Sequence, residues 1–298
     1  GWAAQPYRTS RTRYYPNHAE WIIDRPAVQQ VYAGTATLVA ETRSYYDHHA
    51  NLGDAPDPGD LTRQEQVAVR GGQYEDASRW THRDYSYDTY GNRTLVQDEL
   101  QHPTTTCYDG WFHAFPLKTT NALQQSSSAY YYGVPGGSCA VADGPLSFGP
   151  GRFGLLERSQ DANGVSTTYT YDDLGRVTSV VEPPNDGANP TRTFTYRASA
   201  GIGPNQPFWV QEAVRDDGGE TNYRATYTFY DGFGRILQRS TEAPRAVGGQ
   251  VQYIESRNAY NWRDAKRYAS VPAYVLAESD GSTVYHPVTN WTTLPHTG

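Results

Sequence analysis

The sequence lacks several of the residue types on which ordinary protein interiors depend. It contains no methionine, five isoleucines and two cysteines, whereas tyrosine occurs 25 times. Globular cores normally rely on leucine, isoleucine, valine and phenylalanine. The mean hydropathy is −0.75. This composition predicts broad, half-exposed sheets rather than one thick apolar core.

The sequence is also poor in lysine and has an excess of acidic residues. The net charge is −7, and Lys118 and Lys266 are the only lysines among 25 basic residues. An acidic chain is not expected to bind nucleic acid or an anionic membrane by bulk attraction. Arginine can stack on tyrosine rings, although a GC-rich genome would produce the same bias. No run of 18 apolar residues exists, so no membrane-spanning helix is expected.

Motifs that carry common enzyme chemistry are missing. The sequence contains no G-x-S-x-G, H-E-x-x-H, Walker or C-x-x-C pattern. The acidic loop at 47–60 spaces its aspartates three apart around prolines, which favours stiff turns over a calcium site. The expectation is therefore no catalytic residue, no cofactor and no metal. The chain also shows no signal peptide and no initiator methionine, and we interpret it as a processed product or a piece of something longer.

What the sequence does contain is a repeat. The segments 98–109, 121–132 and 161–172 each begin with a turn-forming residue, continue through small hydroxyl residues and have a tyrosine-rich end. If 136–151 is an insertion, the spacing indicates one unit per roughly 21 residues. Alternation along 165–171 predicts a strand, and a second strand follows the turn. The repeat therefore predicts an all-β meander of antiparallel hairpins.

The turns of this repeat follow an Asp-x-x-Gly pattern. The aspartate can accept backbone N–H groups of its own turn, and glycine can take the positive φ that closes a hairpin loop. Gly175 and Gly234 are expected at positive φ, and Gly175→Val should be destabilising. The predicted structural residues are Tyr87, Asp88, Gly91, Arg93, Tyr108, Asp109, Tyr171, Asp172, Gly175, Arg176, Tyr230, Asp231, Gly234 and Arg235.

Three of these turns resemble a known repeat family. The sequences YSYDTYGNR (85–93), YTYDDLGRVTSV (169–180) and FYDGFGRILQRS (229–240) resemble the tyrosine–aspartate (YD) repeats of Rhs proteins, Tc-toxin cocoon subunits and teneurins. The resemblance, with degraded copies, covers roughly 30–262. It implies hairpins wound into an extended, curved or spiral sheet around a hollow that encloses a toxic cargo. The self-cleaving aspartate pair of that family has no counterpart that we can place.

The repeat suggests three regions. We expect an aromatic, basic N-terminal arm at 1–29, a YD-repeat domain at 30–262 with insertions near 47–60 and 136–151, and an extension at 263–298. Tyr169 and Tyr171 are expected to share a face with tyrosines of neighbouring hairpins, such as Tyr85, Tyr87 and Tyr108, with arginines across some rings.

The two cysteines, Cys107 and Cys139, lie in neighbouring repeat units. One interpretation is a disulfide bond between them, and the other is that both cysteines are unpaired small residues. A disulfide would place the Cα atoms about 4.4–6.8 Å apart and indicate an oxidising compartment.

These observations predict a non-catalytic, extracellular or cell-surface structural protein. Our main interpretation is self-assembly with copies of itself into a filament, tube or sheath. In this assembly, residues 1–15 or 282–293 pair with the sheet edge of a neighbouring copy. The alternative is that both ends fold back and cap their own sheet. The alternatives are a segment of an Rhs/Tc-type β-shell that encapsulates a toxin, and a carbohydrate-binding module for surface glycans.

Overall fold

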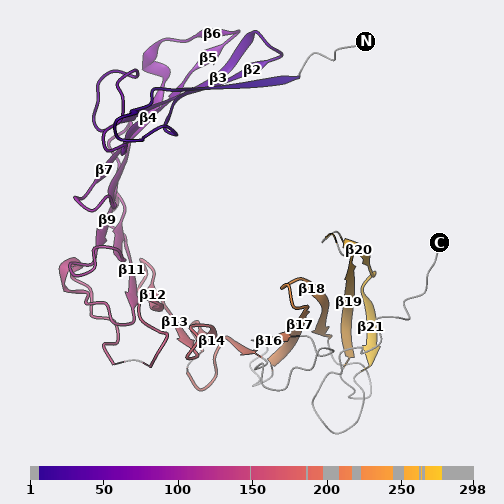
Figure 1. Cartoon of the computed structure of the whole chain (residues 1–298). Helices are drawn as coiled ribbons and strands as arrows, with labels where there is room; N and C mark the ends of the chain where they lie inside the picture. Colours follow the sequence, from indigo (N-terminus) through magenta and orange to yellow (C-terminus); the bar gives the residue numbers. More distant parts are fainter. Residues whose placement is uncertain are drawn as a thin grey trace, which may run out of the picture. The chain divides into compact units, whose positions relative to one another are not determined.

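The computed structural model describes a nearly all-β chain (Figure 1). It describes residues 7–147, 149–185, 187–196, 208–216, 223–243, 252–261, 263 and 266–276. These residues form two compact units. Unit 1 runs to residue 165 without 149–152, and unit 2 consists of 149–152 and the residues from 166 onwards.

Unit 1 is an antiparallel meander in which strands pair with their neighbours in the chain. Its strands are β1 (Arg8–Tyr14), β2 (Pro26–Ala33), β3 (Thr37–Tyr46), β4 (Leu61–Val67), β5 (Val69–Arg70), β6 (Gln73–Tyr74), β7 (Thr81–Tyr87), β8 (Arg93–Asp98), β9 (Pro103–Tyr108), β10 (Pro116–Thr120), β11 (Ser126–Tyr131) and β12 (Leu156–Gln160). The pair β5–β6 is a separate small hairpin, so β4 pairs with β7. Two 3₁₀ turns, η1 (Ala77–Arg79) and η2 (Gly137–Cys139), are the helical elements of the described residues.

Unit 2 repeats the same design. Its strands are β13 (Ser166–Tyr171), β14 (Val177–Val181), β15 (Arg192–Tyr196), β16 (Phe208–Arg215), β17 (Tyr223–Tyr230), β18 (Ile236–Glu242), β19 (Gln252–Tyr260), β20 (Lys266–Ala269) and β21 (Ala273–Leu276). Pairing is antiparallel and sequential from β13 to β19, and β19 then pairs with both β20 and β21. The expected fold class is confirmed in both units.

A β-bulge follows the tyrosine–aspartate ends of the hairpins. In unit 2, Thr170 pairs with Ser179 while Tyr171 pairs with Val177, which leaves Thr178 as the extra residue. The same shift occurs at Tyr46, Tyr87, Tyr108, Tyr131, Tyr230 and Tyr260. A bulge bends its strand and increases the local twist. Simple alternation in the sequence does not reveal it, because the extra residue is in the return strand.

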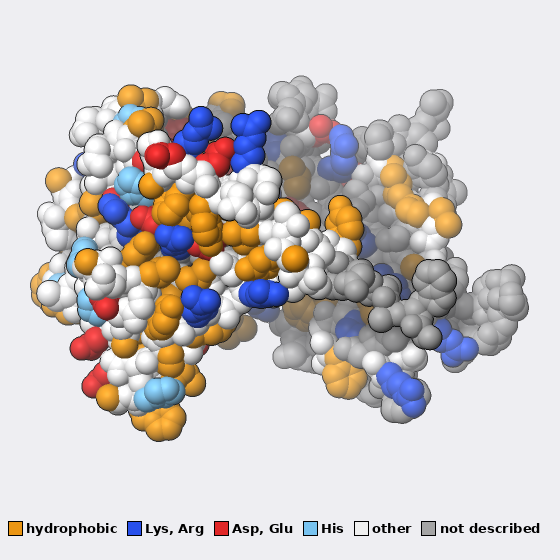
Figure 2. All heavy atoms as spheres, turned by 90° about the horizontal axis from the view of Figure 1, so that it is seen from above, with side chains coloured by type: hydrophobic (Ala, Val, Ile, Leu, Met, Phe, Trp, Pro, Cys, Tyr) orange, Lys and Arg blue, Asp and Glu red, His pale blue; other side chains and the backbone are white. Residues whose placement is uncertain are grey.

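The interior is thin and partly polar, as the composition predicts. In unit 1 the buried apolar cluster is Leu117, Val134 and Cys139. In unit 2, Gln238 and Ser240 are fully buried, and Gln238 donates to Ser240, which donates to Glu255. On the face seen in Figure 2, hydrophobic side chains lie at the surface among basic and acidic ones.

The strands at the ends of the repeat can be set beside the three expected regions. Residues 8–14 of the expected arm form β1, which pairs along its length with β2 of the same chain. The expected boundary at 29/30 falls inside β2. The segments 1–6 and 282–293 lie outside the described residues, so their pairing with a neighbour stays a prediction. The hairpin β5–β6 is an insertion that the sequence did not indicate.

Candidate functional site: the tyrosine–aspartate turns

The short turns of unit 2 are closed by an aspartate and an arginine four residues later. Asp172 Oδ1 accepts the backbone N–H groups of Leu174 (3.0 Å) and Arg176 (2.9 Å), and Oδ2 accepts Arg176 Nε at 2.7 Å. Gly175 has φ 76°. This positive φ costs glycine little and other residues more, which explains why glycine occupies the position.

The second turn of unit 2 has the same geometry. Asp231 Oδ1 accepts the N–H groups of Phe233 (2.9 Å) and Arg235 (3.0 Å), and Oδ2 binds the guanidinium of Arg235. Gly234 has φ 79°. The expected turn geometry at Gly175 and Gly234 is therefore present in both copies.

The turn at Asp88 in unit 1 replaces the arginine with an asparagine. Asp88 Oδ1 accepts the N–H groups of Tyr90 and Asn92, both at 2.9 Å, and Asn92 Nδ2 donates to Asp88 Oδ2 at 3.0 Å. Gly91 has φ 81°. Arg93 lies one residue further along and stacks over Tyr85, with its guanidinium carbon 5.5 Å from the ring centroid.

Asp109 closes a longer loop that has no arginine and in which His113, rather than a glycine, has a positive φ (54°). Its carboxylate is almost completely buried and accepts four backbone N–H groups, from Trp111, Phe112, Ala114 and Phe115. Burial alone would raise the pKa of this carboxyl, but the four donors outweigh it and lower the pKa to about 2. Asp109 is therefore a fixed anion around which the loop folds.

Asp47 plays the same part in the proline-rich loop at 47–60. Its carboxylate accepts the backbone N–H groups of Asp57, Gly59 (3.0 Å) and Asp60 (2.7 Å). The sequence shows only a Tyr-Asp pair followed by an insertion, whereas the structure shows that the aspartate ties the insertion's far end back to the strand.

The carboxylates of the short turns are also stabilised as anions. Burial raises the pKa of Asp172, but the backbone and side chain of Arg176 outweigh it, so the pKa is lowered. The pKa of Asp231 is lowered in the same way by Arg235, and that of Asp88 by Asn92. A general acid needs a raised pKa, so these carboxyls are poorly suited to proton donation near neutral pH.

The tyrosine of these ends binds the main chain of the preceding hairpin. Tyr196 Oη donates to the carbonyl of Val177 at 2.9 Å, and Tyr260 Oη donates to that of Ile236 at 3.1 Å. Each acceptor lies at the start of the preceding return strand. Equivalent bonds in unit 1 are Tyr46 to Pro26, Tyr87 to Leu61 and Tyr131 to Pro116. We call this bond the tyrosine clamp; phenylalanine could not form it.

In unit 2 the clamp and the aspartate share one arginine. Arg176 binds Asp172 and lies over the ring of Tyr196, with its guanidinium carbon 4.4 Å from the ring centroid. Arg235 binds Asp231 and lies 4.8 Å from the centroid of Tyr260. An arginine between a carboxylate and an aromatic face gains both charge pairing and cation–π attraction. One hairpin's turn is thereby joined to the next hairpin's tyrosine.

Arginines do lie across several tyrosine rings, as expected, but not across all. Arg158 lies 3.6 Å from the Tyr130 centroid and Arg11 lies 4.5 Å from that of Tyr32. The ladder expected between Tyr169 or Tyr171 and the tyrosines of 85–108 would join the two units, and it stays a prediction.

The turns at the opposite ends of the hairpins have the same hydrogen bonds, but the residue at positive φ is not always glycine. Asp98 Oδ1 accepts the N–H groups of Leu100 and His102, and Asn121 Oδ1 accepts those of Leu123 and Gln125. The residues at positive φ are Gln101 (65°), Gln124 (62°) and, in the Asp161 turn, Gly164 (82°).

A disulfide fastens the large insertion of unit 1 to the sheet. Cys107 on β9 is bonded to Cys139 in η2, and the Cα atoms are 5.7 Å apart. The bridge sits beside Leu117 and Val134, with Phe115 and Tyr131 packed against them. Gly144 lies so close to the Tyr131 backbone that a Cβ atom would be 1.7 Å from the Tyr131 carbonyl oxygen. The 132–147 segment is therefore fixed to the sheet and is not a loose loop.

Comparison with known proteins agrees with the resemblance seen in the sequence. The family described as RHS Repeat matches residues 152–183, which include the Asp172 turn. No curated protein matches the chain in sequence.

Solved Tc-toxin structures share the fold. A TcdB2-TccC3 crystal structure aligns with 90% of this chain at TM-score 0.59 and 13% identity, covering 18% of its own chain. The TcdB2-TccC3-TEV structure aligns with 94% at TM-score 0.59 and 11% identity, covering 20% of its own. The Photorhabdus luminescens Tc holotoxin pore aligns with 90% at TM-score 0.57 and 11% identity, covering 19% of its own. The chain thus spans about a fifth of the structures it matches.

Within the described residues, no helix is both long and apolar enough to cross a membrane.

The candidate site is a repeated set of contacts rather than a pocket. An aspartate closes the turn, an arginine or asparagine supports the aspartate, and a tyrosine clamps the preceding hairpin. Residues 152–183, which carry the Asp172 turn, thus match the RHS Repeat family, and 90% of the chain shares the fold of a solved Tc toxin.

Proposed function

We propose that this chain is a wall segment of an Rhs/Tc-type β-shell that encloses a polypeptide cargo, and that its role is structural rather than catalytic. The observation that carries the proposal is the tyrosine clamp, because it ties each participating hairpin to the one before it at a strand end. A wall made of thin sheet has little core to hold it together, so contacts between hairpins must supply the stiffness.

The fold shared with TcdB2-TccC3 supports this role over the filament that we first favoured. Self-assembly through sheet edges would require a free edge to capture a neighbour. Among the described residues β1 pairs on one side only, with β2. Its exposed side chains include Arg8, Arg11 and Arg13, and like charges on an edge oppose addition of an identical strand.

The disulfide favours an oxidising compartment, so we propose that the protein acts outside the cell or at its surface. Copies of this chain as partners also remain a proposal, which the same experiment addresses.

The experiment is sedimentation velocity and electron microscopy of the purified chain over a range of concentrations. A shell segment should give particles of one defined mass whose size does not grow with concentration. Open-ended filaments that lengthen as concentration rises would contradict the shell-segment proposal and restore self-assembly. As a control, the variant Tyr196→Phe/Tyr260→Phe should give particles of the same mass that unfold more easily, since the clamp is internal to each copy.

A further inference from the structure

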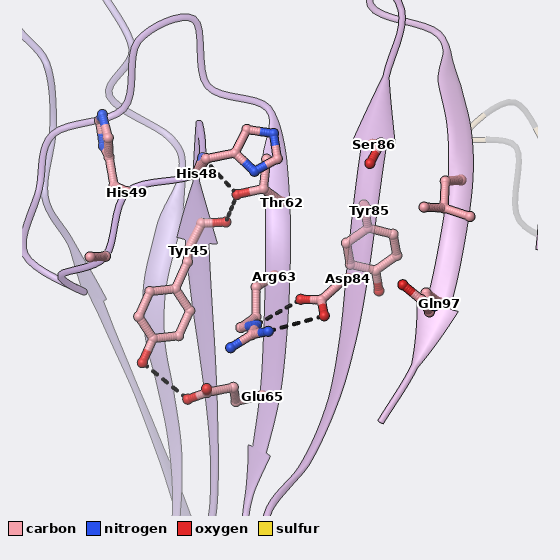
Figure 3. Close-up of a pocket in the computed structure, with 12 residues that line it drawn as sticks. Tyr45, His48, His49, Thr62, Arg63, Glu65, Asp84, Tyr85, Ser86 and Gln97 are labelled. Atoms are coloured by element: carbon pink, nitrogen blue, oxygen red, sulfur yellow. Dashed lines mark hydrogen bonds and ion pairs between the residues drawn. The ribbon is translucent and has the colours of Figure 1, made fainter. Parts of the chain in front are cut away.

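Unit 1 carries a groove that the turns and clamps do not use. It lies on one face of the sheet, over β3, β4, β7 and β8, and the proline-rich loop at 47–60 bounds one end (Figure 3). Its volume of about 470 Å³ is within the range of small-ligand sites. The lining is more polar than apolar, which is unusual for such sites and informative about the ligand.

The floor of the groove is a row of polar side chains aligned by strand register. Tyr45 pairs with Arg63, Arg63 with Asp84, and Asp84 with Gln97, so these four residues lie directly opposite one another across four strands. Glu65 is two residues from Arg63 and therefore lies on the same face. The row arises because each strand of the meander pairs with the next one in this register.

Mutual bonds hold the row in place. Arg63 binds Asp84 through two bonds, from Nε at 2.6 Å and from a terminal nitrogen at 3.0 Å. Tyr45 Oη donates to Glu65 at 3.0 Å. Figure 3 shows both interactions along the floor, with Gln97 on the outer strand. Side chains already fixed in position lose little conformational freedom when a ligand binds.

Several polar groups in the groove remain available. The side-chain amide of Gln97 and the hydroxyl of Ser86 bind no partner among the described residues. Glu65 uses one carboxylate oxygen for Tyr45, which leaves the other. At the loop end, the Nδ1 atom of His49 is buried and unbonded in the described part of the chain.

The charges define the class of ligand. The single guanidinium of the groove is already paired with Asp84, and Glu65 adds a second carboxylate, so an anion such as a phosphate finds no unpaired cation. A ligand with neighbouring hydroxyl groups fits instead. The amide of Gln97 can donate to one hydroxyl, and the carboxylate of Glu65 can accept from another. Tyr45 and Leu95, on the two outer strands, supply limited apolar surface.

We propose that this groove binds a neutral saccharide, with Gln97 and Glu65 hydrogen-bonding its hydroxyls and Arg63–Asp84 forming the floor. The inference does not depend on the shell role, because it concerns the face of one unit only. It also differs from the sequence-based idea of a tryptophan platform, since no tryptophan lines the groove.

The test begins with the intact chain on an array of neutral and acidic oligosaccharides, followed by titration calorimetry with the best-retained sugar. Gln97→Ala and Glu65→Gln should each weaken binding by about tenfold, the effect of one good hydrogen bond to a ligand. Gln66→Ala is the matched control, because Gln66 neighbours Glu65 but points to the other face of β4, and its binding should equal that of the parent.

Three results would overturn the proposal. They are no retained saccharide, retention only of acidic saccharides, or neutral binding that both groove variants leave unchanged. A reduced and alkylated globular protein serves as an unfolded-peptide probe. If it binds instead and loses affinity in the same variants, the groove is a peptide site. Because Gln97 has no internal partner, Gln97→Ala should keep the parent's unfolding midpoint, which separates lost binding from lost folding.

Discussion

Unit 2 closes its short turns with Asp172 and Asp231, each of which binds an arginine four residues later, whereas unit 1 uses Asp47 and Asp109 to close much longer loops. In unit 2 the arginine also joins the turn to the next tyrosine. In the 47–60 loop Asp47 accepts backbone N–H groups 10 to 13 residues further along, and in the 109–115 loop Asp109 accepts those 2 to 6 residues further along.

The comparison teaches that the aspartate, rather than the Gly-Arg that follows it, is the constant element. A carboxylate at the end of the outgoing strand can gather the amides of a short turn or of a long insertion. The pairing of the two strands therefore does not depend on the length of the loop that joins them. This explains how unit 1 holds the insertion at 47–60 and the longer loop at 109–115 between regular strands.

The largest expected effect comes from removing the buried carboxylate of unit 1. Asp109→Ala leaves four inward-facing N–H groups without an acceptor, and we expect the free energy of unfolding to fall by about 3–5 kcal/mol. Urea titration followed by tyrosine fluorescence measures it. Asp172→Ala in unit 2, whose carboxylate accepts two backbone amides at a more exposed turn, should cost less. An equal cost at both sites would remove the distinction between the units.

Loss of the disulfide should affect unit 1 selectively. Cys107 and Cys139 are 32 residues apart, and closing such a loop restricts the unfolded chain by about 3–4 kcal/mol. Cys107→Ser/Cys139→Ser should therefore speed hydrogen exchange at Leu117 and Val134. Exchange in β17 and β18 of unit 2 is the internal control, and a comparable increase there would contradict the assignment.

Acid should weaken unit 1 through Asp109. Its pKa is lowered to about 2 in the folded state, against about 3.9 when unfolded. A lowered carboxyl pKa contributes stability that is fully present above the unfolded value and is lost as pH falls from about 4 to 2. The contribution is about 2.5 kcal/mol. Unfolding midpoints measured between pH 7 and pH 2 should show this loss in the parent, and a smaller one in Asp109→Asn.

The tyrosine clamp should be worth about one hydrogen bond at each position. Tyr196→Phe removes the bond to Val177 but keeps the ring over Arg176, so we expect a loss of about 1 kcal/mol. Tyr90→Phe is the control, because the Tyr90 hydroxyl has no partner in the described structure. If both variants match the parent in thermal unfolding, the clamp does not stiffen the sheet.

The smallest effect is expected at Gln101, at one end of a hairpin, and it contrasts with a larger loss at Gly175, at the other kind of end. Gln101 has φ 65°, where glycine is less strained, so Gln101→Gly should stabilise unit 1 by about 0.5–1 kcal/mol. Glu99→Gly, at an ordinary φ in the same turn, should instead lose stability. Gly175→Val should be destabilising by more than about 1 kcal/mol. Calorimetric midpoints order the three variants, and a loss at Gln101→Gly would refute the strain argument.

Much of each hairpin could be predicted from the sequence because its signals are local. Alternation over 165–171 and the Asp-x-x-Gly turn indicated β13, β14 and the positive φ of Gly175. The tyrosine clamp could not be predicted, since its acceptor is a backbone carbonyl 15–26 residues earlier, as at Tyr131 and Tyr87. The recurrence of tyrosine rather than phenylalanine at these ends was the available signal.

By itself, the sequence determined the all-β class, the repeat and the turn chemistry, because strand periodicity and turn conformation depend on neighbours within a few residues. Only the tertiary structure decided which distant groups meet. It closed the loops on Asp47 and Asp109, joined Cys107 to Cys139 and placed Gln97 in line with Tyr45. These contacts depend on strand register, and bulges and insertions of variable length set that register in ways that alternation does not encode.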